Sequence, residues 1–132
     1  MTLCQVYASN IQLLPYQEII LSWEKSEVNV HHTKPEYLKI LEDAQYEVRY
    51  EIKWKYITAT TQPFQATVYK VSKEFTLHAI QHNVTVCVGN PITLKKNIPL
   101  DLKKGDRVCI GAKNFSTSQF TLIECKFSLV QT

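Results

Sequence analysis

Histidine and cysteine are the side chains of this 132-residue chain best suited to catalysis or metal binding, and the sequence has four of each. The histidines, which ordinarily titrate near neutral pH, are His31, His32, His78 and His82. Nucleophilic catalysis needs a nucleophile, a base and an orienting group within hydrogen-bond reach. The sequence has no nucleophile elbow, phosphate-binding glycine-rich loop or dinucleotide fingerprint, and its three glycines leave little room for one. We therefore expect no enzymatic activity, no catalytic residue and no cofactor.

Two of the histidines have the spacing that binds zinc on a helix, where residues four apart share a face. His78 and His82 lie, however, in a segment that alternates like a strand, residues 76–86. On a strand they would share a face but stand about 13 Å apart, which is too far to share one ion. We expect no metal site here, and we expect His31 and His32 to lie in a solvated loop.

The four cysteines are widely spaced and include no CxxC pair, which argues against a zinc or dithiol redox site. Cysteine packs as a small hydrophobic residue, so we expect buried free thiols rather than disulfides. The four are Cys4, Cys87, Cys109 and Cys125.

Two triplets, Asn83-Val84-Thr85 and Asn114-Phe115-Ser116, match the pattern for N-glycosylation. Such triplets arise by chance in chains rich in Asn, Ser and Thr, and chance is the interpretation that we favour. Whether either triplet is used stays open at the level of sequence.

The elements that must position these residues are strands, and the clearest one covers residues 46–56. Apolar or aromatic residues alternate there with charged ones, and successive side chains of a strand point to opposite faces. The segment therefore predicts a long strand with one face in a core and the other toward water or a partner. The two sets are Tyr46, Val48, Tyr50, Ile52, Trp54 and Tyr56 on one face, and Glu47, Arg49, Glu51, Lys53 and Lys55 on the other.

Two interpretations of the charged face stay open. It is either a solvated sheet face, or a surface on which Glu47, Arg49 and Glu51 meet complementary charges of a neighbouring subunit. The aromatics Tyr7, Tyr16, Trp23, Tyr37, Trp54 and Tyr69 could build a sugar-binding platform. We expect most of them to fill the core or an interface between subunits instead, because a β-sandwich needs large residues between its sheets.

Shorter strands are predicted along the rest of the chain, separated by turn residues. A loop is expected at residues 9–10, a polar turn at 58–63 and turns at 90–91 and 103–106, where Gly105 suits a positive-φ position. The strands are expected at residues 3–8, 18–23, 27–32, 37–40, 64–71, 92–94, 98–102, 107–112 and 120–131, with one or two more within 75–88. With no amphipathic helix, this pattern predicts one antiparallel all-β domain, a sandwich or barrel, over residues 1–132.

Charge and hydropathy exclude several classes of function. The formal net charge is only +3, and the lysines are interleaved with acids, so we expect no nucleic-acid partner. No apolar stretch approaches the roughly 20 residues that span a bilayer, so we expect no membrane insertion. The start of the sequence also lacks the pattern of a signal peptide.

Three stretches, in this order and spacing, resemble the jelly-roll superfamily of tumour necrosis factor and the complement component 1q globular head. Residues 41–52, LEDAQYEVRYEI, are similar to its G-x-Y-x-V-S-Y-x-I central strand. Residues 98–110, IPLDLKKGDRVCI, are similar to its V-x-L-x-x-G-D-x-V-x-L hairpin, and residues 120–130 to its closing strand. Residues 6–21 resemble the opening of bacterial members, such as the C-terminal head of the collagen-like exosporium glycoprotein BclA.

Two departures from the pattern concern the central strand. The family has a glycine before the first tyrosine of this strand. In this chain the corresponding residue is Ala44, which lies one place further upstream. The family often carries Ser and small residues on the outward face, where this chain has charges.

The resemblance implies a ten-stranded jelly roll with its first and last strands side by side, which would bring Cys4 and Cys125 into one sheet. It also implies a homotrimer, in which a histidine on the three-fold axis could still hold an ion. Strand parity selects as interface candidates Gln5, Tyr7, Arg49, Lys126, Ser128 and Val130. The expected core residues are Tyr46, Val48, Tyr50, Ile52, Trp54, Val108, Ile110, Phe127 and Leu129.

The function implied is that of a non-enzymatic trimeric head for surface presentation, recognition or adhesion, with a protein or glycan receptor as a candidate partner. Its place would be a cell, spore or particle surface, or the extracellular space. The alternatives are a cytokine-like ligand that binds a receptor, and a viral or phage receptor-binding head of the same fold.

Overall fold

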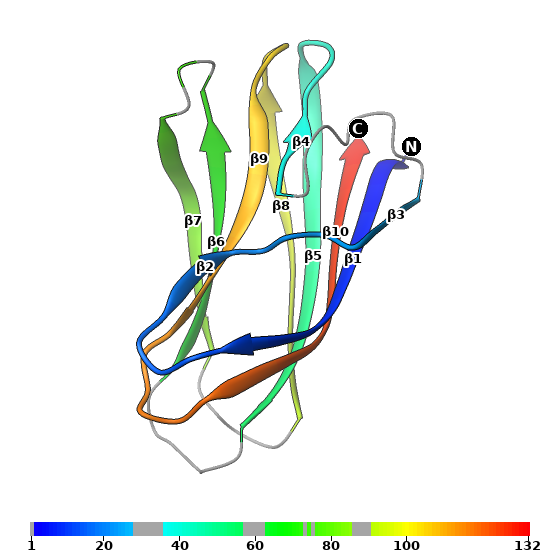
Figure 1. The fold of residues 1–132 in the computed structure, drawn as a ribbon. Coiled ribbons are helices and arrows are strands. Elements are labelled where there is room, and N and C mark those ends of the chain that lie inside the picture. The colour runs from blue at the N-terminus through cyan, green and yellow to red at the C-terminus, as the bar shows by residue number, and fades with distance from the viewer. Residues whose placement is uncertain (1, 28–35, 57–62, 73, 75, 86–90) are drawn as a thin grey trace.

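The computed structural model describes residues 2–27, 36–56, 63–72, 74, 76–85 and 91–132. Within these ranges it contains ten strands (Figure 1) and no helix that could cross a membrane. The all-β, antiparallel jelly roll predicted from the sequence is confirmed. The strands are β1 (Thr2–Leu13), β2 (Glu18–Ile20), β3 (Lys25–Glu27), β4 (Leu38–Lys39), β5 (Ala44–Tyr56), β6 (Phe64–Val71), β7 (Leu77–Thr85), β8 (Ile92–Leu102), β9 (Arg107–Asn114) and β10 (Phe120–Gln131).

The strands form two antiparallel sheets. One has the order β3-β1-β10-β5-β8 and contains both terminal strands, so we call it the terminal-strand sheet. The other, which we call the β9 sheet, has the order β2-β9-β6-β7, and β4 also pairs with β9. Neighbours in space are mostly distant in sequence, as in a jelly roll.

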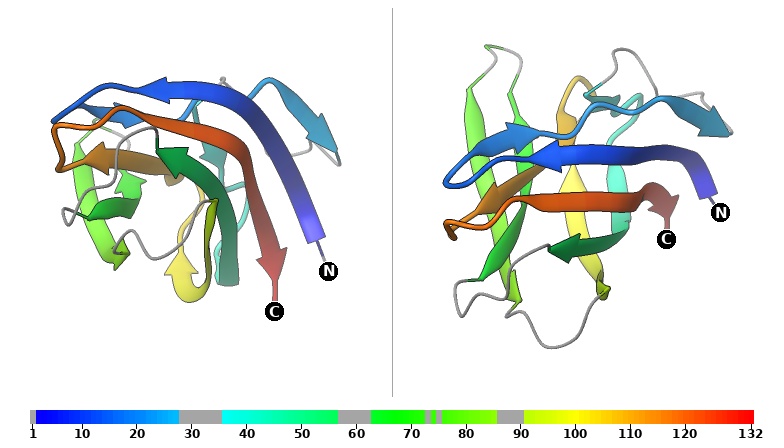
Figure 2. Two further views of the ribbon diagram at one scale, coloured as in Figure 1. Left: turned by 90° about the horizontal axis from the view of Figure 1, so that it is seen from below. Right: turned by 60° about the horizontal axis from the view of Figure 1, so that its bottom comes forward.

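The first and last strands lie side by side along almost their whole length, as predicted. Thr2 pairs with Val130 at one end and Leu13 with Phe120 at the other. Both views in Figure 2 show the two strands bending together. Cys4 and Cys125 consequently belong to the same sheet, where they pair with Leu129 and Ala8 rather than with each other.

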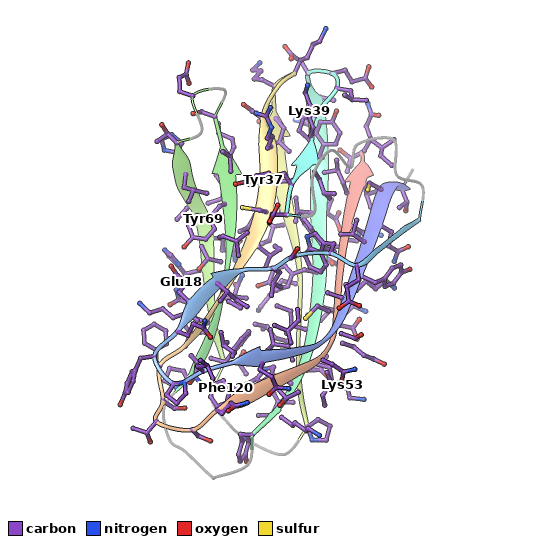
Figure 3. The ribbon with its side chains drawn as sticks, viewed as in Figure 1. Glu18, Tyr37, Lys39, Lys53, Tyr69 and Phe120 are labelled. Carbon is purple, nitrogen blue, oxygen red and sulfur yellow. The ribbon has the colours of Figure 1, made fainter. Side chains whose placement is uncertain are left out.

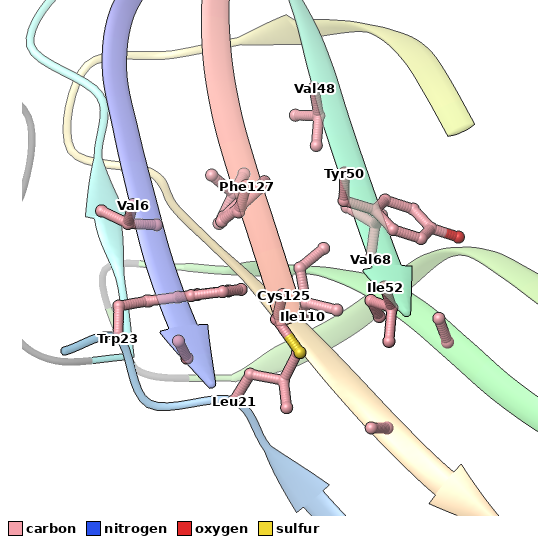
Figure 4. Close-up of a cluster of buried hydrophobic side chains, with 14 of the residues drawn as sticks. Val6, Leu21, Trp23, Val48, Tyr50, Ile52, Val68, Ile110, Cys125 and Phe127 are labelled. Carbon is pink, nitrogen blue, oxygen red and sulfur yellow. The ribbon is translucent and has the colours of Figure 1, made fainter. Parts of the chain in front are cut away.

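The core lies between the sheets and is built largely by alternate residues of β1, β5, β8 and β10 from one sheet and of β6 and β9 from the other (Figure 4). The charged residues between the apolar ones of β5 are exposed or half-buried. The structure buries all nine residues expected in the core: Tyr46, Val48, Tyr50, Ile52, Trp54, Val108, Ile110, Phe127 and Leu129.

An aromatic cluster fills one end of the core. The ring of Trp54 lies 4.7 Å from that of Phe120 and 5.1 Å from that of Phe64, measured between centroids. These rings come from β5, β10 and β6, so the cluster joins both sheets. Trp23 packs similarly on Phe127, at 5.7 Å.

The predicted loop at residues 9–10 is wrong, because β1 continues through it to Leu13. Asn10 adopts a positive φ of 53° inside the strand. Asparagine tolerates this conformation better than most residues, so the chain bends without ending the pairing.

The separate strands predicted at 92–94 and 98–102 are wrong for a similar reason. They are one strand, β8, which includes the polar residues 95–97 and Pro99. Because β8 pairs only with β5 in its sheet, it is an edge strand, where proline and polar side chains are tolerated.

Other boundaries also shift. The strand predicted over 18–23 ends at Ile20 as β2, after which Leu21 donates its amide to the carbonyl of Ile110. The strand predicted over 27–32 begins earlier, as β3, and residues 28–35 lie outside the described residues. Much of the turns predicted at 58–63 and 90–91 lies outside them too. The turn at 103–106 is confirmed, and Gly105 has the expected positive φ, 93°.

A hydrogen bond between two buried side chains crosses the core from one sheet to the other. The side-chain amide of Asn83 on β7 donates to the Tyr50 hydroxyl on β5 at 2.6 Å. Burial raises the pKa of Tyr50 to about 12, although this hydrogen bond acts in the opposite direction. The two buried polar groups therefore satisfy each other.

Tyr50→Phe removes this hydroxyl and leaves the Asn83 amide without that partner. We expect the free energy of unfolding to fall by about 1–3 kcal/mol, the usual cost of an unsatisfied buried polar group. Urea denaturation followed by tryptophan fluorescence measures the change. Tyr16→Phe, at an exposed ring, is the control and should cost less than about 0.5 kcal/mol. Equal losses in the two variants would contradict the role given to the hydrogen bond.

Alkaline pH should destabilise the fold. Burial raises the pKa of Tyr50, Cys109 and Cys125 to about 12 in each case, from ordinary values of 10.0 for tyrosine and 9.0 for cysteine. The folded state thus keeps protons that the unfolded chain releases, so their contribution to stability is complete below pH 9 and is lost toward pH 12. We expect the urea midpoint to fall across this range, and to fall less steeply in Cys125→Ala. A midpoint that stays constant would refute this prediction.

Candidate functional site

The outward face of the terminal-strand sheet carries the interface candidates and the charged residues of β5 that the sequence singled out. Cross-strand register sets them in rows that run from β1 through β10 and β5 to β8, and residues in a row share a face. The middle rows are Gln5–Ser128–Arg49–Asn97, Tyr7–Lys126–Glu51–Lys95 and Ser9–Glu124–Lys53–Thr93.

Two adjoining hollows open on this face. The larger, of about 550 Å³, includes Tyr7, Glu51 and Glu124 in its lining. The smaller, of about 220 Å³, includes Arg49 and Glu51, so the two share a wall. Figure 3 places Lys53, which lines the larger hollow, beside the lower bend of β1 and β10. Both hollows are open to solvent, and their linings are mostly polar side chains.

The face has one ion pair among the described residues. The Arg49 guanidinium donates from Nε to Glu47 Oε1 at 2.7 Å, between two residues of one strand. Glu51 lies directly between Lys126 and Lys95 in its row but forms an ion pair with neither within the described part of the chain.

The six interface candidates all lie on this face by register. Gln5 and Tyr7 are half-buried, and Arg49 and Lys126 are exposed. Ser128 and Val130 face outward but are only 7% exposed, because neighbouring side chains cover them. A partner on this face would therefore meet mainly the first four.

The expectation that His78 and His82 share a face is wrong. The register between β6 and β7 shifts between Val68 and Tyr69, so His82 pairs with Thr67 and His78 with Lys70. These two β6 positions are three residues apart and therefore point to opposite faces. His31 and His32 lie outside the described residues.

His82 takes part in a small polar cluster on the outer face of the β9 sheet. Its Nδ1 lies 2.8 Å from Thr67 Oγ1 and 3.1 Å from Gln65 Nε2. Among the described residues, no three or more His, Cys, Asp or Glu side chains gather as a metal site would require.

Cys4, Cys109 and Cys125 are buried thiols, and Cys87 lies outside the described residues. Burial raises the pKa of the Cys109 and Cys125 thiols to about 12, with a smaller contribution from Glu36 at Cys109. A nucleophilic cysteine needs the thiolate form. These two are therefore packing residues.

The aromatics do not form one platform. Trp23 and Trp54 are in the core, and Tyr7 lies on the terminal-strand sheet. Figure 3 shows Tyr37 and Tyr69 on the side of the β9 sheet. The Tyr69 ring covers Gly111, where an added Cβ would lie 2.7 Å from the ring, so the glycine makes room for this contact.

Both glycosylation triplets place their asparagine inside the fold. Asn83 is 8% exposed and its amide nitrogen donates to Tyr50. Asn114 is fully buried, and its amide nitrogen donates to the carbonyls of Leu13 and Ser118 at 3.2 and 2.7 Å. Neither nitrogen can carry a glycan in the folded chain, so the interpretation of chance triplets is the one that fits.

Asn114 instead organises an exposed turn at residues 14–16. Its carbonyl oxygen accepts from Ser116, and its amide donates to the strand end at Leu13. The turn that follows presents Leu14, 50% exposed, and Tyr16, 65% exposed, with a positive φ of 59° at Tyr16. Holding a tyrosine in that conformation costs about 1–3 kcal/mol, so the surrounding hydrogen bonds must fix the turn.

Asn114→Ala should unfix this turn and destabilise the domain. We expect the free energy of unfolding to fall by about 2 kcal/mol or more, because several buried groups lose their partner. Urea denaturation measures the loss, and hydrogen exchange should show faster exchange of the Gln17 amide, which donates to Leu14. Asn97→Ala, at an exposed site on β8, is the control. Unchanged exchange at Gln17 would contradict the organising role of Asn114.

Solved structures share this fold. The chain is similar to the tumour necrosis factor Eiger of S. frugiperda, with a TM-score of 0.68 and 12% identity over 99% of this chain and 92% of that chain. It is similar to the globular domain of zebrafish complement 1qA, with a TM-score of 0.67 and 13% identity over 97% and 94%. The match to murine APRIL has a TM-score of 0.69 and 7% identity over 98% of each chain.

No protein-family model and no curated protein matches the chain. At identities of 7–13%, the likeness concerns the backbone and the order of its strands. The chain therefore has the jelly-roll fold seen in tumour necrosis factor and complement 1q heads.

Proposed function

We propose that this domain is a non-enzymatic homotrimeric head, which holds three chains in register and presents an outer surface for recognition or adhesion. The observation that carries the proposal is the outward face of the terminal-strand sheet. Its inner face packs the core, whereas its outer face carries charges and two hollows that no element of the described chain covers.

The superfamily that the sequence resembles generally forms homotrimers, which supports this assembly. The fold is shared with complement 1q and tumour necrosis factor structures over nearly the whole chain. The interface would contain Gln5, Tyr7, Arg49 and Lys126, with Ser128 and Val130 beneath them. A cell, spore or particle surface, as for the exosporium heads that the opening of the sequence resembles, is the setting that we propose.

Binding of a receptor, as by a cytokine-like ligand, is the second candidate. It is favoured by the exposed turn at Leu14–Tyr16, which is held rigid by the Asn114 hydrogen bonds. A pre-organised apolar tip loses little conformational entropy when it meets a partner. The turn is separate from the proposed interface, so it could serve recognition in the trimer.

The assembly is tested by light scattering on a sizing column. We expect a folded species with about three times the 15.3 kDa mass of the chain. A folded species of 15.3 kDa at all protein concentrations between 1 and 100 µM, roughly the range in which stable and transient interfaces differ, would remove the trimeric head.

A further inference from the structure

Several charges on the outward face of the terminal-strand sheet have no partner of opposite sign in their own chain. Glu51, Lys53, Lys95, Glu124 and Lys126 form no ion pair within the described residues. Register nevertheless sets opposite charges next to one another, since Lys126 and Lys95 flank Glu51, and Glu124 pairs with Lys53. Strand register thus sets positive and negative residues side by side on this face, a charge mosaic, but the side chains of these five residues do not form ion pairs with one another.

The two hollows on this face differ in the sign of their charge. The larger has three carboxylates and two ammonium groups in its lining: Glu24, Glu51, Glu124, Lys53 and Lys126. The smaller has three cationic groups and one carboxylate: Arg49, Lys95, Lys126 and Glu51. Glu47, just beside the smaller hollow, is bound to Arg49. Glu51 and Lys126 line both hollows, so the larger has an excess of one negative charge and the smaller an excess of two positive charges. We call them the acidic hollow and the basic hollow.

We propose that the acidic hollow of one copy docks on the basic hollow of the next, so that ion pairs between chains close the ring. This inference rests on the trimer proposed above and specifies what holds it together. Contacts between two different patches are heterologous, and they generate a closed ring when the rotation between copies is right. Both patches belong to every chain, so a second copy supplies the missing partner of each.

An interface made of such charges should respond to salt differently from an apolar interface. An apolar interface is strengthened by salts such as sulfate and is largely insensitive to sodium chloride. Ion pairs at a partly hydrated interface weaken as the Debye length shrinks from about 10 Å at 0.1 M salt to about 3 Å at 1 M. The assembly should therefore dissociate on addition of sodium chloride while each chain stays folded.

Charge reversal tests the pairing between the hollows. Glu124→Lys makes the acidic hollow basic, and Lys95→Glu removes the excess positive charge of the basic hollow. Each variant alone should raise the protein concentration of half-assembly about tenfold or more. The double variant E124K/K95E exchanges the charges of these two positions, so an ion pair that they form between chains is restored with its signs reversed, and the variant should assemble within about threefold of the original chain.

The measurement is light scattering over a range of protein concentrations, at 0.1 M and 1 M sodium chloride, with circular dichroism to show that each variant is folded. Glu74→Lys and Lys104→Glu, at exposed positions away from this face, are the controls and should leave assembly unchanged. In 1 M sodium chloride the protein concentration of half-assembly of the original chain should rise by about tenfold or more, as it does for either single variant at 0.1 M.

The outcomes separate the two proposals. If the chain forms a trimer whose assembly is unchanged by salt and by the single charge reversals, the ion-pair inference is overturned, whereas the proposal of a trimeric head is not affected. The inference is also overturned if the double variant assembles as weakly as the effects of the two single reversals added together would give. A chain that is monomeric and folded at 0.1 M salt rejects the trimer and, with it, this inference.

Discussion

The alternation of apolar and charged residues along β5 is the constraint on which the rest of the structure depends. β5 pairs with β10 on one side and β8 on the other, and β10 pairs with β1. A shift of one residue in any of these registers would turn the core side chains of that strand to water and bury its charges. Trp54 and Tyr50, which contact elements of both sheets, add a further penalty to such a shift.

The same alternation that builds the core also builds the candidate site. Each apolar residue that β5 places between the sheets is followed by a charge on the outer face, so core and face share one register. Two adjacent strands add Glu124, Lys126 and Lys95 to the rows. The result is a face whose charges are set in rows by the pairing of β1, β10, β5 and β8.

Hydrogen bonds between buried polar groups fix the position of β7 relative to β5 and the conformation of the turn at Leu14–Tyr16. The Asn83–Tyr50 hydrogen bond joins the edge strand β7 to β5 across the core. Asn114 and Ser116 tie the end of β9 to the end of β1 and so set the turn at Leu14–Tyr16. Both asparagines lie in glycosylation triplets, and in both cases the side chain has a structural task that its sequence pattern does not reveal.

By itself, the sequence determined the strands with strong alternation, the turn at Gly105 and the parity that separates core from face, because these depend on neighbouring residues. It did not determine that β1 and β8 are continuous, since pairing with distant strands carried β1 through Asn10 and β8 through residues 95–97. Nor did it place His78 and His82 on opposite faces, because a register shift against β6 decides this. Only the tertiary structure brought Glu24, Glu124 and Lys95 onto one surface, since they lie on segments that meet through pairing across the sheet.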